Sequence, residues 1–309
     1  MVNSINFVIL GDYSIAMEFG KKGTETDIAI YDKKTADIIY TWTAPITFPD
    51  KIQSLMQAVN MAEYAILNVT KLDKYLGEQI IALDSVDFKD GFILYSYDID
   101  EAKLKTLIQD TSISNFKFLD NIDQLKQALT KLEPKSSTGP VIIHVDHAFD
   151  VKGVGTVVLG VVRQGTVNVH DELTLLPSGK NILVKSIQMH DEPVEKSDSP
   201  ARVGLAIKGI PAEEISRGDV ICLPDTLKVS SDPISVKFTK SMFFKGELVE
   251  NQTYMISVGL QIKPAKIKQT GDLLEITAEK PVVYRQSQTC VLLKPDNQGT
   301  RIVGKGIIQ

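Results

Sequence analysis

The sequence predicts an α/β domain followed by two small β-barrels, and three observations point to that order. Short apolar runs alternate with helical patterns over residues 1–132. A stretch rich in proline, glycine and serine follows at residues 133–140, and beyond it only short β-branched runs recur. The chain has 309 residues, of which 43% are hydrophobic and 24% charged, as in ordinary globular proteins.

The first domain alternates buried strands with amphipathic helices. Its predicted strands are residues 5–10, 62–69, 91–97 and 115–119, and residues 26–32 and 37–44 alternate about a polar turn like an antiparallel pair. Its predicted helices, with apolar residues at i, i+3 and i+4, are residues 51–61, 72–83, 101–109 and 121–132. Strands that alternate with helices indicate a mainly parallel sheet.

The segment EPKSSTGP at residues 133–140 cannot continue a helix and is typical of a linker. After it, strand-plus-turn spacing predicts all-β barrels. The predicted strands are residues 141–147, 156–163, 181–190, 201–208, 233–240, 253–259, 273–278, 288–294 and 301–308. Because PDTLK at residues 224–228 divides this region, we expect domains at residues 1–134, 140–224 and 228–309.

The charge is unevenly distributed. The chain carries 34 basic and 39 acidic residues, a formal charge of −5, yet residues 228–309 carry 12 basic and 7 acidic residues. That excess favours a polyanion contact at this end, or equally a solvated lysine-rich surface. Cys222 and Cys290 cannot form a disulfide framework. With no apolar run near the ~20 residues that span a bilayer, and no secretory signal pattern, we expect a cytoplasmic protein without a membrane partner.

The second region resembles a known family. Residues 149–177 (FDVKGVGTVVLGVVRQGTVNVHDELTLLP), 184–194 and 210–221 (IPAEEISRGDVI) resemble the second domain of translational GTPases, in particular elongation factor Tu and the selenocysteine-specific elongation factor. Residues 301–308 (RIVGKGII) are similar to the last strand of the family's third domain. The resemblance implies a P-loop-GTPase-like first domain followed by two barrels.

The phosphate-binding motif of that family has lost its chemistry here. The motif G-x-x-x-x-G-K-[ST] supplies amides, a cation and a Mg²⁺-binding hydroxyl. After the first strand this chain begins with Gly11 but has Ala16, Met17 and Glu18 at the three later positions. A carboxylate there repels a triphosphate by about 1 kcal/mol or more. A shifted alignment over residues 20–22 also lacks the motif.

The other nucleotide motifs fail in the same way. The family's D-T-P-G falls on residues 43–46 (TAPI), and its guanine-binding N-K-x-D falls on residues 95–98 (YSYD), where only Asp98 remains. Residues 1–139 contain no arginine that could stabilise a transferred phosphate. We therefore expect a pseudo-GTPase with no catalytic residues, which binds neither GTP nor Mg²⁺. A divergent but active GTPase is the alternative.

The resemblance also implies a pocket for the aminoacylated 3′ end of tRNA on the first barrel. By motif position it would involve Asp146, Val151, Gly153, Val157 and Gln188. Val151 and Val157 would form an apolar platform for the terminal adenine, and Asp146 or Gln188 would hydrogen-bond the terminal sugar. Valines and glycines at these positions also suit a purely structural role in the barrel, and both interpretations stay open.

In the family the third domain touches tRNA stems through phosphates. The basic residues expected to do so here are Lys263, Lys266, Lys268 and Arg301.

Two further motifs have simpler interpretations. His144 and His147 lie on a predicted strand at a spacing that places them on opposite faces, so we expect no shared metal and no metal site. The run KKGT at residues 21–24 could bind phosphate but is expected to be a solvated loop.

Together these observations predict a translation-related pseudo-GTPase that binds tRNA or ribosomal RNA without GTP hydrolysis. The expected partners are tRNA, the ribosome or a translation protein, and not DNA. Besides an active GTPase, a protein-interaction scaffold without RNA contact is the other alternative.

Overall fold

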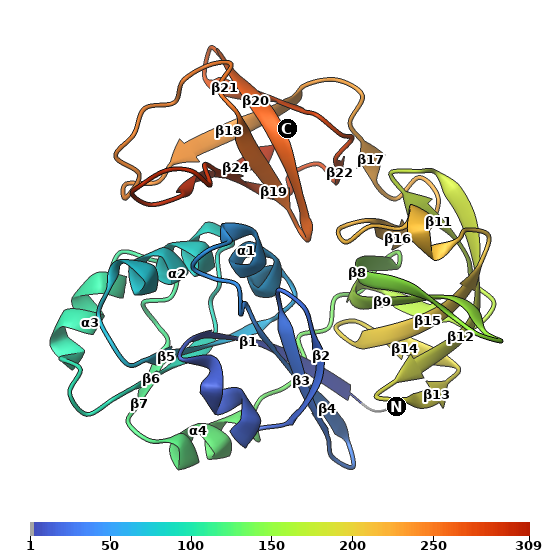
Figure 1. Ribbon diagram of the computed structural model, residues 1–309, viewed down its shortest axis with the longest axis horizontal. Coiled ribbons are helices and arrows are strands. Elements are labelled where there is room, and N and C mark those ends of the chain that lie inside the picture. The colour runs from blue at the N-terminus through green and yellow to red at the C-terminus, as the bar shows by residue number, and fades with distance from the viewer. Residues whose placement is uncertain (1–2) are drawn as a thin grey trace. The chain divides into compact units, whose positions relative to one another are not determined.

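The computed structural model describes residues 3–309 and separates the chain into two compact units. The first comprises the chain up to Pro134 together with the segment Thr300–Ile302, and the second comprises Lys135–Gly299 and Val303–Gln309. Figure 1 shows the helices in the first unit and the two barrels in the second.

The first unit is built on a seven-stranded sheet with the order β2-β3-β4-β1-β5-β6-β7. Its strands are β1 (Asn3–Gly11), β2 (Lys21–Glu25), β3 (Ala29–Lys34), β4 (Ile38–Ala44), β5 (Tyr64–Val69), β6 (Gly91–Tyr95) and β7 (Lys117–Leu119). Its helices are η1 (Tyr13–Glu18), α1 (Ile52–Asn60), α2 (Lys74–Ser85), α3 (Glu101–Ile108) and α4 (Ile122–Leu129).

The centre of this sheet is parallel and its edge is antiparallel. Strand β1 pairs in parallel with β4 and β5, and β6 and β7 continue the parallel order. Strands β2, β3 and β4 pair antiparallel. Because β1 lies in the middle, its residues from Ser4 to Leu10 are all buried. The carboxyl ends of β1, β5 and β6 therefore meet at one edge of the sheet, where α/β folds place ligands.

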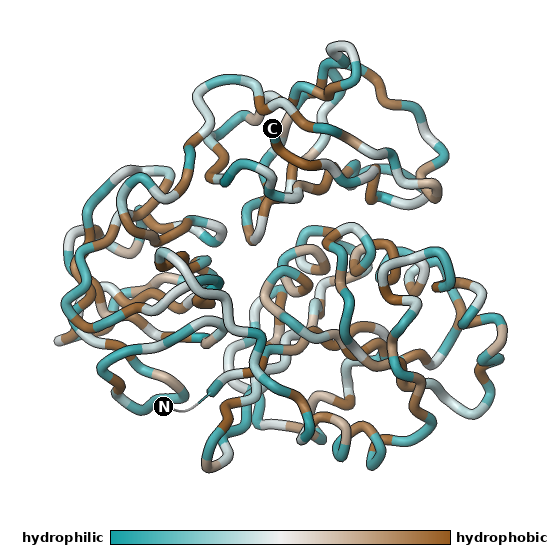
Figure 2. Tube along the Cα trace, turned by 180° about the vertical axis from the view of Figure 1, so that it is seen from behind, coloured by the Kyte–Doolittle hydropathy of each residue, from teal (hydrophilic) through white to brown (hydrophobic). Residues whose placement is uncertain are grey.

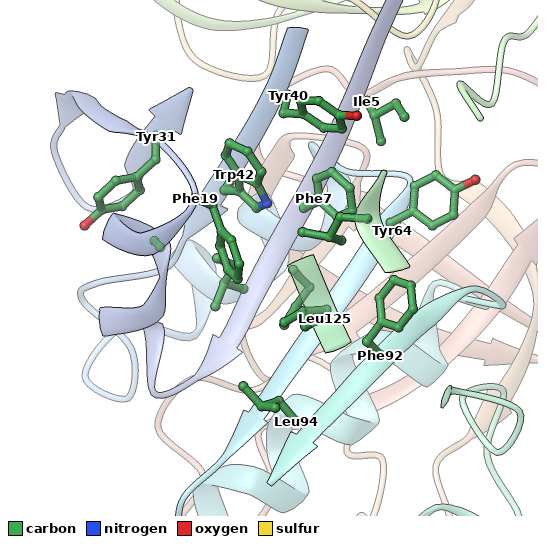
Figure 3. Close-up of a cluster of buried hydrophobic side chains, with 14 of the residues drawn as sticks. Ile5, Phe7, Phe19, Tyr31, Tyr40, Trp42, Tyr64, Phe92, Leu94 and Leu125 are labelled. Atoms are coloured by element: carbon green, nitrogen blue, oxygen red, sulfur yellow. The ribbon is translucent and has the colours of Figure 1, made fainter. Parts of the chain in front are cut away.

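An aromatic layer covers one face of the sheet, as Figure 3 shows. The ring of Phe7 lies 5.7 Å from both Trp42 and Tyr64, and Phe19 lies 5.6 Å from Trp42. Leu125 of α4 joins the same cluster. Each such ring buries a large apolar area, so this layer supplies much of the unit's core.

The first barrel of the second unit is closed. Its strands are β8 (Ile142–Val151), β9 (Gly155–Gln164), β11 (Glu172–Leu176), β12 (Lys180–Met189), β13 (Glu192–Val194), β15 (Arg202–Lys208) and β16 (Val220–Cys222). They follow the order β11-β16-β8-β9-β15-β12-β13, and an additional β11–β12 pairing closes the ring. A separate ribbon is formed by β10 (Thr166–Asn168) and β14 (Lys196–Asp198), and η2 spans Ala212–Glu214.

The second barrel closes in the order β18-β21-β20-β19-β23-β24. Its strands are β18 (Ile234–Lys240), β19 (Tyr254–Val258), β20 (Gln261–Thr270), β21 (Leu273–Ala278), β23 (Thr289–Leu293) and β24 (Ile302–Ile308), with a ribbon of β17 (Lys228–Val229) and β22 (Val283–Tyr284). Apolar and hydrophilic residues interchange along these strands, as Figure 2 shows, because only the inward side chains enter the core.

The two barrels share a buried contact within the second unit. A Cβ on Gly259 would lie 2.6 Å from the His144 ring, and one on Gly218 would lie 2.9 Å from the Cα of Gln261. Burial, and to a lesser extent two nearby arginines, lowers the pKa of His144 to about 3. The imidazole is therefore neutral where the barrels meet.

The predicted fold class is confirmed, and one local prediction is wrong. Residues 21–24, expected to form a solvated loop, belong to β2, which pairs with β3, and Lys22 forms an ion pair with Glu25. The sequence analysis also missed β20, because the alternating lysines of QIKPAKIKQT conceal its inward face. Across residues 3–309, no helix has both the length and the apolar character needed to cross a membrane.

Candidate functional site

The backbone that leaves β1 is tied to the end of β5. Gly11 adopts a φ of +78°, and a Cβ there would lie 2.0 Å from the Asn68 carbonyl oxygen, so only glycine fits. The Asp12 amide donates to that carbonyl at 3.0 Å, and the Asn68 side-chain amide donates to the Asp12 carbonyl at 2.7 Å. The Ser14 amide donates to the Asp12 carboxylate at 3.0 Å. Two of the first amides after β1 are thus already bonded within the protein.

A six-residue 3-10 helix, η1, follows β1 directly and leads into β2. Ala16 is fully buried against the aromatic layer, and Met17 is 69% exposed. The Glu18 carboxylate pairs with Lys126 of α4 at 3.1 Å. Phosphate-binding loops use the N-terminus of a longer α-helix, whose amides and dipole attract anions. Here the segment is too short for that, and it carries a carboxylate.

The end of β6 holds the predicted remnant of a guanine-binding motif. Tyr95 donates its hydroxyl to Glu101 at 2.6 Å, and this hydrogen bond raises the pKa of Tyr95. Tyr97 is fully exposed, and Asp98 lies in the turn where the Ile99 amide donates to Ser96. Asp98 therefore has a role in chain reversal that is independent of any ligand.

A cavity of about 260 Å³ lies beside this edge, against the ends of β1 and β5. Asn68, Thr70, Lys71, Asp73 and Tyr75 are among its lining residues. The one lysine among the residues that line it, Lys71, lies 3.0 Å from the Asp73 carboxylate. That carboxylate caps α2 through two backbone amides. The cavity thus presents a neutralised cation rather than a free one.

The first barrel places most of the predicted pocket residues on its outer face. In the β8–β9 hairpin, Phe149 pairs with Val157 and Val151 pairs with Gly155. Phe149 and Val151 are 43% and 36% exposed, so they offer an apolar surface to a partner. Gly153 and Gly155 have φ values of +82° and +98° with open space around them, which the hairpin turn requires.

Strand register brings Gln188 into the same face. Gln188 pairs with Gly204, Gly204 with Leu159, and Leu159 with His147, so these residues form a row across four strands. A Cβ on Gly204 would lie 3.4 Å from Leu159 and 4.0 Å from Gln188. The missing side chain therefore leaves a shallow depression in the middle of the row.

A buried charge cluster borders this face. Asp146 is 2% exposed, and its carboxylate accepts from Arg202 Nε at 3.0 Å and contacts His147 Nδ1 at 3.1 Å. Arg217 donates to the Asp146 carbonyl at 3.1 Å and lies 3.3 Å from His147 Nε2. Since a guanidinium can only donate, Nε2 accepts and Nδ1 carries the proton that bonds Asp146. The cluster thus fixes one tautomer of His147.

The electrostatics of Asp146 follow from this geometry. Burial alone would raise its pKa, but the Arg202 charge and the His147 hydrogen bond outweigh burial and lower it. Both carboxylate oxygens are engaged, so a direct bond from Asp146 to a sugar, as the sequence predicted, would have to displace Arg202 or His147. Arg202 and Arg217 were not predicted from the sequence, because they lie far from Asp146 along the chain and belong to no motif.

The four predicted phosphate contacts differ in their exposure and in the partners that they already have. Lys263 is half-buried, donates to the Pro281 carbonyl and has its pKa lowered mainly by burial. Lys266 and Lys268 are both exposed on β20, with Lys268 opposite Glu275.

Arg301, which belongs to the first unit, is engaged there. Its guanidinium lies against the buried Glu78 carboxylate through Nε at 3.1 Å, and it donates to the Pro49 carbonyl at 2.7 Å. It also lies over the Phe48 ring at 5.6 Å. Its side chain is 12% exposed, so a phosphate contact by Arg301 would require this pairing to open.

No group of histidine, cysteine, aspartate or glutamate within residues 3–309 is arranged to hold a metal ion. Cys222 and Cys290 are buried free thiols, and burial raises their pKa values to about 11 and about 12.

Comparison with known proteins decides the family. The family described as elongation factor Tu domain 2 matches residues 155–222. An uncharacterised protein of Methanocaldococcus jannaschii is 32% identical over 295 residues, which cover 94% of this chain and 95% of that protein. The selenocysteine-specific elongation factor of the same organism is 29% identical over 264 residues. This chain belongs to the translational GTPase-like family.

Members of the translational GTPase-like family share the fold of this chain along its whole length. The elongation factor SelB of Methanococcus maripaludis, solved in complex with the GTP analogue GppNHp, superposes with a TM-score of 0.84 at 23% identity and covers all of this chain and 79% of its own. A bacterial selenocysteine-specific elongation factor also superposes at 0.84, with 20% identity. The matched region covers 55% of the M. jannaschii elongation factor, so this chain spans about half of that protein's length.

Proposed function

We propose that this protein binds an RNA of the translation machinery, foremost the aminoacylated 3′ end of a tRNA, and does so without binding or hydrolysing GTP. The first unit then serves as a scaffold, and the barrels of the second unit carry the RNA-binding surface.

The observation that carries the GTP-independent part is the carboxylate of Glu18 at the last position of the segment that corresponds to the phosphate-binding motif. Glu18 occupies the position of the Mg²⁺-binding hydroxyl and Met17 that of the cation, and the amide of Asp12 is already bonded to Asn68. These residues do not fit a magnesium–triphosphate group, which needs a cation, oxygen ligands for the metal and available amides. The function proposed for this protein therefore includes no step that uses GTP.

The RNA-binding part rests on the outer face of the first barrel. That face combines exposed apolar residues, the depression at Gly204 and the part-exposed side chains of Arg202 and His147. An apolar platform beside the Arg202 guanidinium suits a terminal base, its sugar and an esterified amino acid. Residues 155–222, which match elongation factor Tu domain 2, contain much of it.

The test is filter binding of aminoacylated tRNA to the full chain and to two variants. Gly204→Val fills the depression on a strand that accepts valine, and we expect affinity to fall about tenfold, or ~1.4 kcal/mol. Glu172→Val changes an exposed position of β11, where none of the pocket residues lies, and is expected to bind like the wild type. Equal affinity of all three proteins would contradict this pocket.

A second candidate function, a protein-docking scaffold, is favoured by one observation. Tyr97, which follows β6, is fully exposed, and Met17 of η1 is 69% exposed. Large apolar side chains held in solvent are typical of protein contacts. A pull-down from cell extract with RNA and protein both identified, repeated with Tyr97→Ala, distinguishes the two functions: only a docking scaffold loses a protein partner through this change.

A further inference from the structure

The turn that follows β18 holds two large apolar side chains in solvent. Met242 is 65% exposed and Phe243 is 40% exposed, whereas the adjacent Phe244 is 2% exposed and packs in the core of the second barrel. We call residues 241–245 the β18 turn. Neighbouring apolar side chains that face solvent together indicate an interaction surface more strongly than isolated ones do.

The β18 turn is fixed to the barrel. The Ser241 amide donates to the Val303 carbonyl at 2.9 Å, the Phe244 amide donates to the Ser241 carbonyl at 3.1 Å, and the Phe243 amide donates to Ser241 Oγ at 3.3 Å. Phe244 already fills the core position beneath the turn. Met242 and Phe243 therefore remain at the surface instead of folding inward.

Four lysines belong to the turn or to the two strands that adjoin it. Lys240 and Lys245 lie within or beside the turn, and both are exposed. On the adjoining strands, Lys305 of β24 pairs in register with Thr239, and Lys237 of β18 pairs with Ile307. Residues 237–247 and 302–309 carry these four lysines and a single acidic residue, Glu247. The side chains of these two segments therefore carry an excess of three positive charges.

A polyanion that carries flat apolar groups matches this surface. We propose that the β18 turn binds an unpaired nucleotide of an RNA, with Phe243 stacked on the base and the lysines against the flanking phosphates. Bases in a duplex are already stacked on their neighbours, so only an unpaired base can meet this ring. The proposal rests on RNA binding as the function, and it adds a base contact to the phosphate contacts that the family resemblance implies.

RNA is favoured over a membrane surface by the shape of the patch. A membrane-bound amphipathic element presents a continuous apolar face, usually along a helix. Here the exposed apolar side chains are Met242 and Phe243 at the turn and Ile307 on β24, which pairs in register with Lys237, so lysines interrupt the apolar residues. Aromatic rings in a positively charged groove are the usual platform for single-stranded nucleic acid.

The experiment compares a short single-stranded RNA carrying 2-aminopurine with a blunt duplex of the same sequence, both bound to the full chain. Phe243→Ala is expected to weaken single-strand binding about 5- to 150-fold and to abolish quenching of 2-aminopurine, with duplex affinity unchanged. Phe243→Tyr retains a ring and should bind like the wild type. Val249→Ala, at an apolar residue that is 41% exposed outside the turn, is the matched control.

The possible results of this experiment separate the stacking contact from RNA binding as such. If the wild type binds single-stranded RNA and Phe243→Ala binds it equally with the same quenching, stacking is wrong and RNA binding stands. If the wild type binds neither of these RNAs but retains aminoacylated tRNA in filter binding, the stacking contact is wrong and the proposed function stands; if it binds none of the three, both are wrong. Sedimentation with phosphatidylserine vesicles that Phe243→Ala abolishes, with RNA binding unaffected, would assign the turn to a membrane instead. Circular dichroism of each variant confirms that it is folded.

Discussion

Replacing Asp146 with asparagine tests the charge cluster of the first barrel. The carboxylate is 2% exposed and the Arg202 side chain 17% exposed, and they meet at 2.9 Å. Removing one partner of a buried ion pair leaves the other charge uncompensated, which costs about 3–5 kcal/mol. Because Arg202 retains some solvent contact, we expect Asp146→Asn to lie near the lower end, at about 3 kcal/mol.

Hydrogen exchange followed by mass spectrometry is the appropriate assay. The chain has a single tryptophan, Trp42, which lies in the first unit, so its fluorescence does not report on the barrels. Peptides covering β8 and β15 should lose protection in Asp146→Asn. The control is Glu214→Gln, which breaks an ion pair with Lys180 whose two side chains are each 45% exposed and should cost below ~1 kcal/mol. Equal losses of hydrogen-exchange protection in the two variants would show that the buried Asp146–Arg202 pair stabilises the barrel no more than the exposed Lys180–Glu214 pair.

The same cluster gives a pH dependence with a definite sign. The pKa of Asp146 is lowered by folding, so its contribution to stability is present above the unfolded-state pKa of about 3.9. That contribution is lost as the pH falls below this value, because the unfolded chain then binds a proton that the folded carboxylate resists. Protection of β8 should therefore fall more steeply with acid in the wild type than in Asp146→Asn.

Three further outcomes are expected. The folded-state pKa of His144, about 3, lies below its usual value of 6.5, so the unfolded chain takes up a proton first as the pH falls. The free energy of unfolding of the second unit should therefore fall by roughly 1.4 kcal/mol per pH unit below 6.5. His144→Gln should remove this pH dependence, as measured by hydrogen exchange. Cys222 and Cys290, with pKa values of about 11 and about 12, should react with a thiol reagent at pH 8 only as the protein unfolds; rapid reaction of the native protein would contradict their burial. Phe7→Ala should destabilise the first unit by about 3–5 kcal/mol in urea, followed by Trp42 fluorescence, since it removes the centre of the aromatic layer.

The sequence predicted the architecture because its periodicity is strong where the core is continuous. Strand β1 is buried on both faces and corresponds to the run INFVIL at residues 5–10, which is apolar except for Asn6, and the helices keep their apolar stripes. Strand β2 was missed because it lies at the sheet edge and places lysines and a glycine in solvent. Strand β20 was missed because Lys266 and Lys268 occupy its outward positions.

The candidate site was predicted less completely, because contacts across the fold leave no local pattern. The residues Ala16, Met17 and Glu18, on which the predicted absence of GTP binding depends, can be read directly from a contiguous segment. The partners of Asp146 cannot, since Arg202 lies 56 residues away and meets it only through the barrel. Arg301 likewise looked like an available cation, yet Glu78, 223 residues distant, already engages it.

The exposed residues of the β18 turn could not be predicted from the sequence either. In the sequence, the three consecutive apolar residues at 242–244 are indistinguishable from a core segment. Only the fold shows that Phe244 enters the core and that Met242 and Phe243 do not.

Isothermal titration of the full chain with GTP and with GDP, each in the presence of Mg²⁺, is the most direct test of whether this protein binds a guanine nucleotide. We expect no measurable heat of binding up to millimolar nucleotide, because Met17 and Glu18 supply neither the cation nor the metal-binding hydroxyl. Micromolar binding of either nucleotide would contradict it and would point instead to a divergent GTPase.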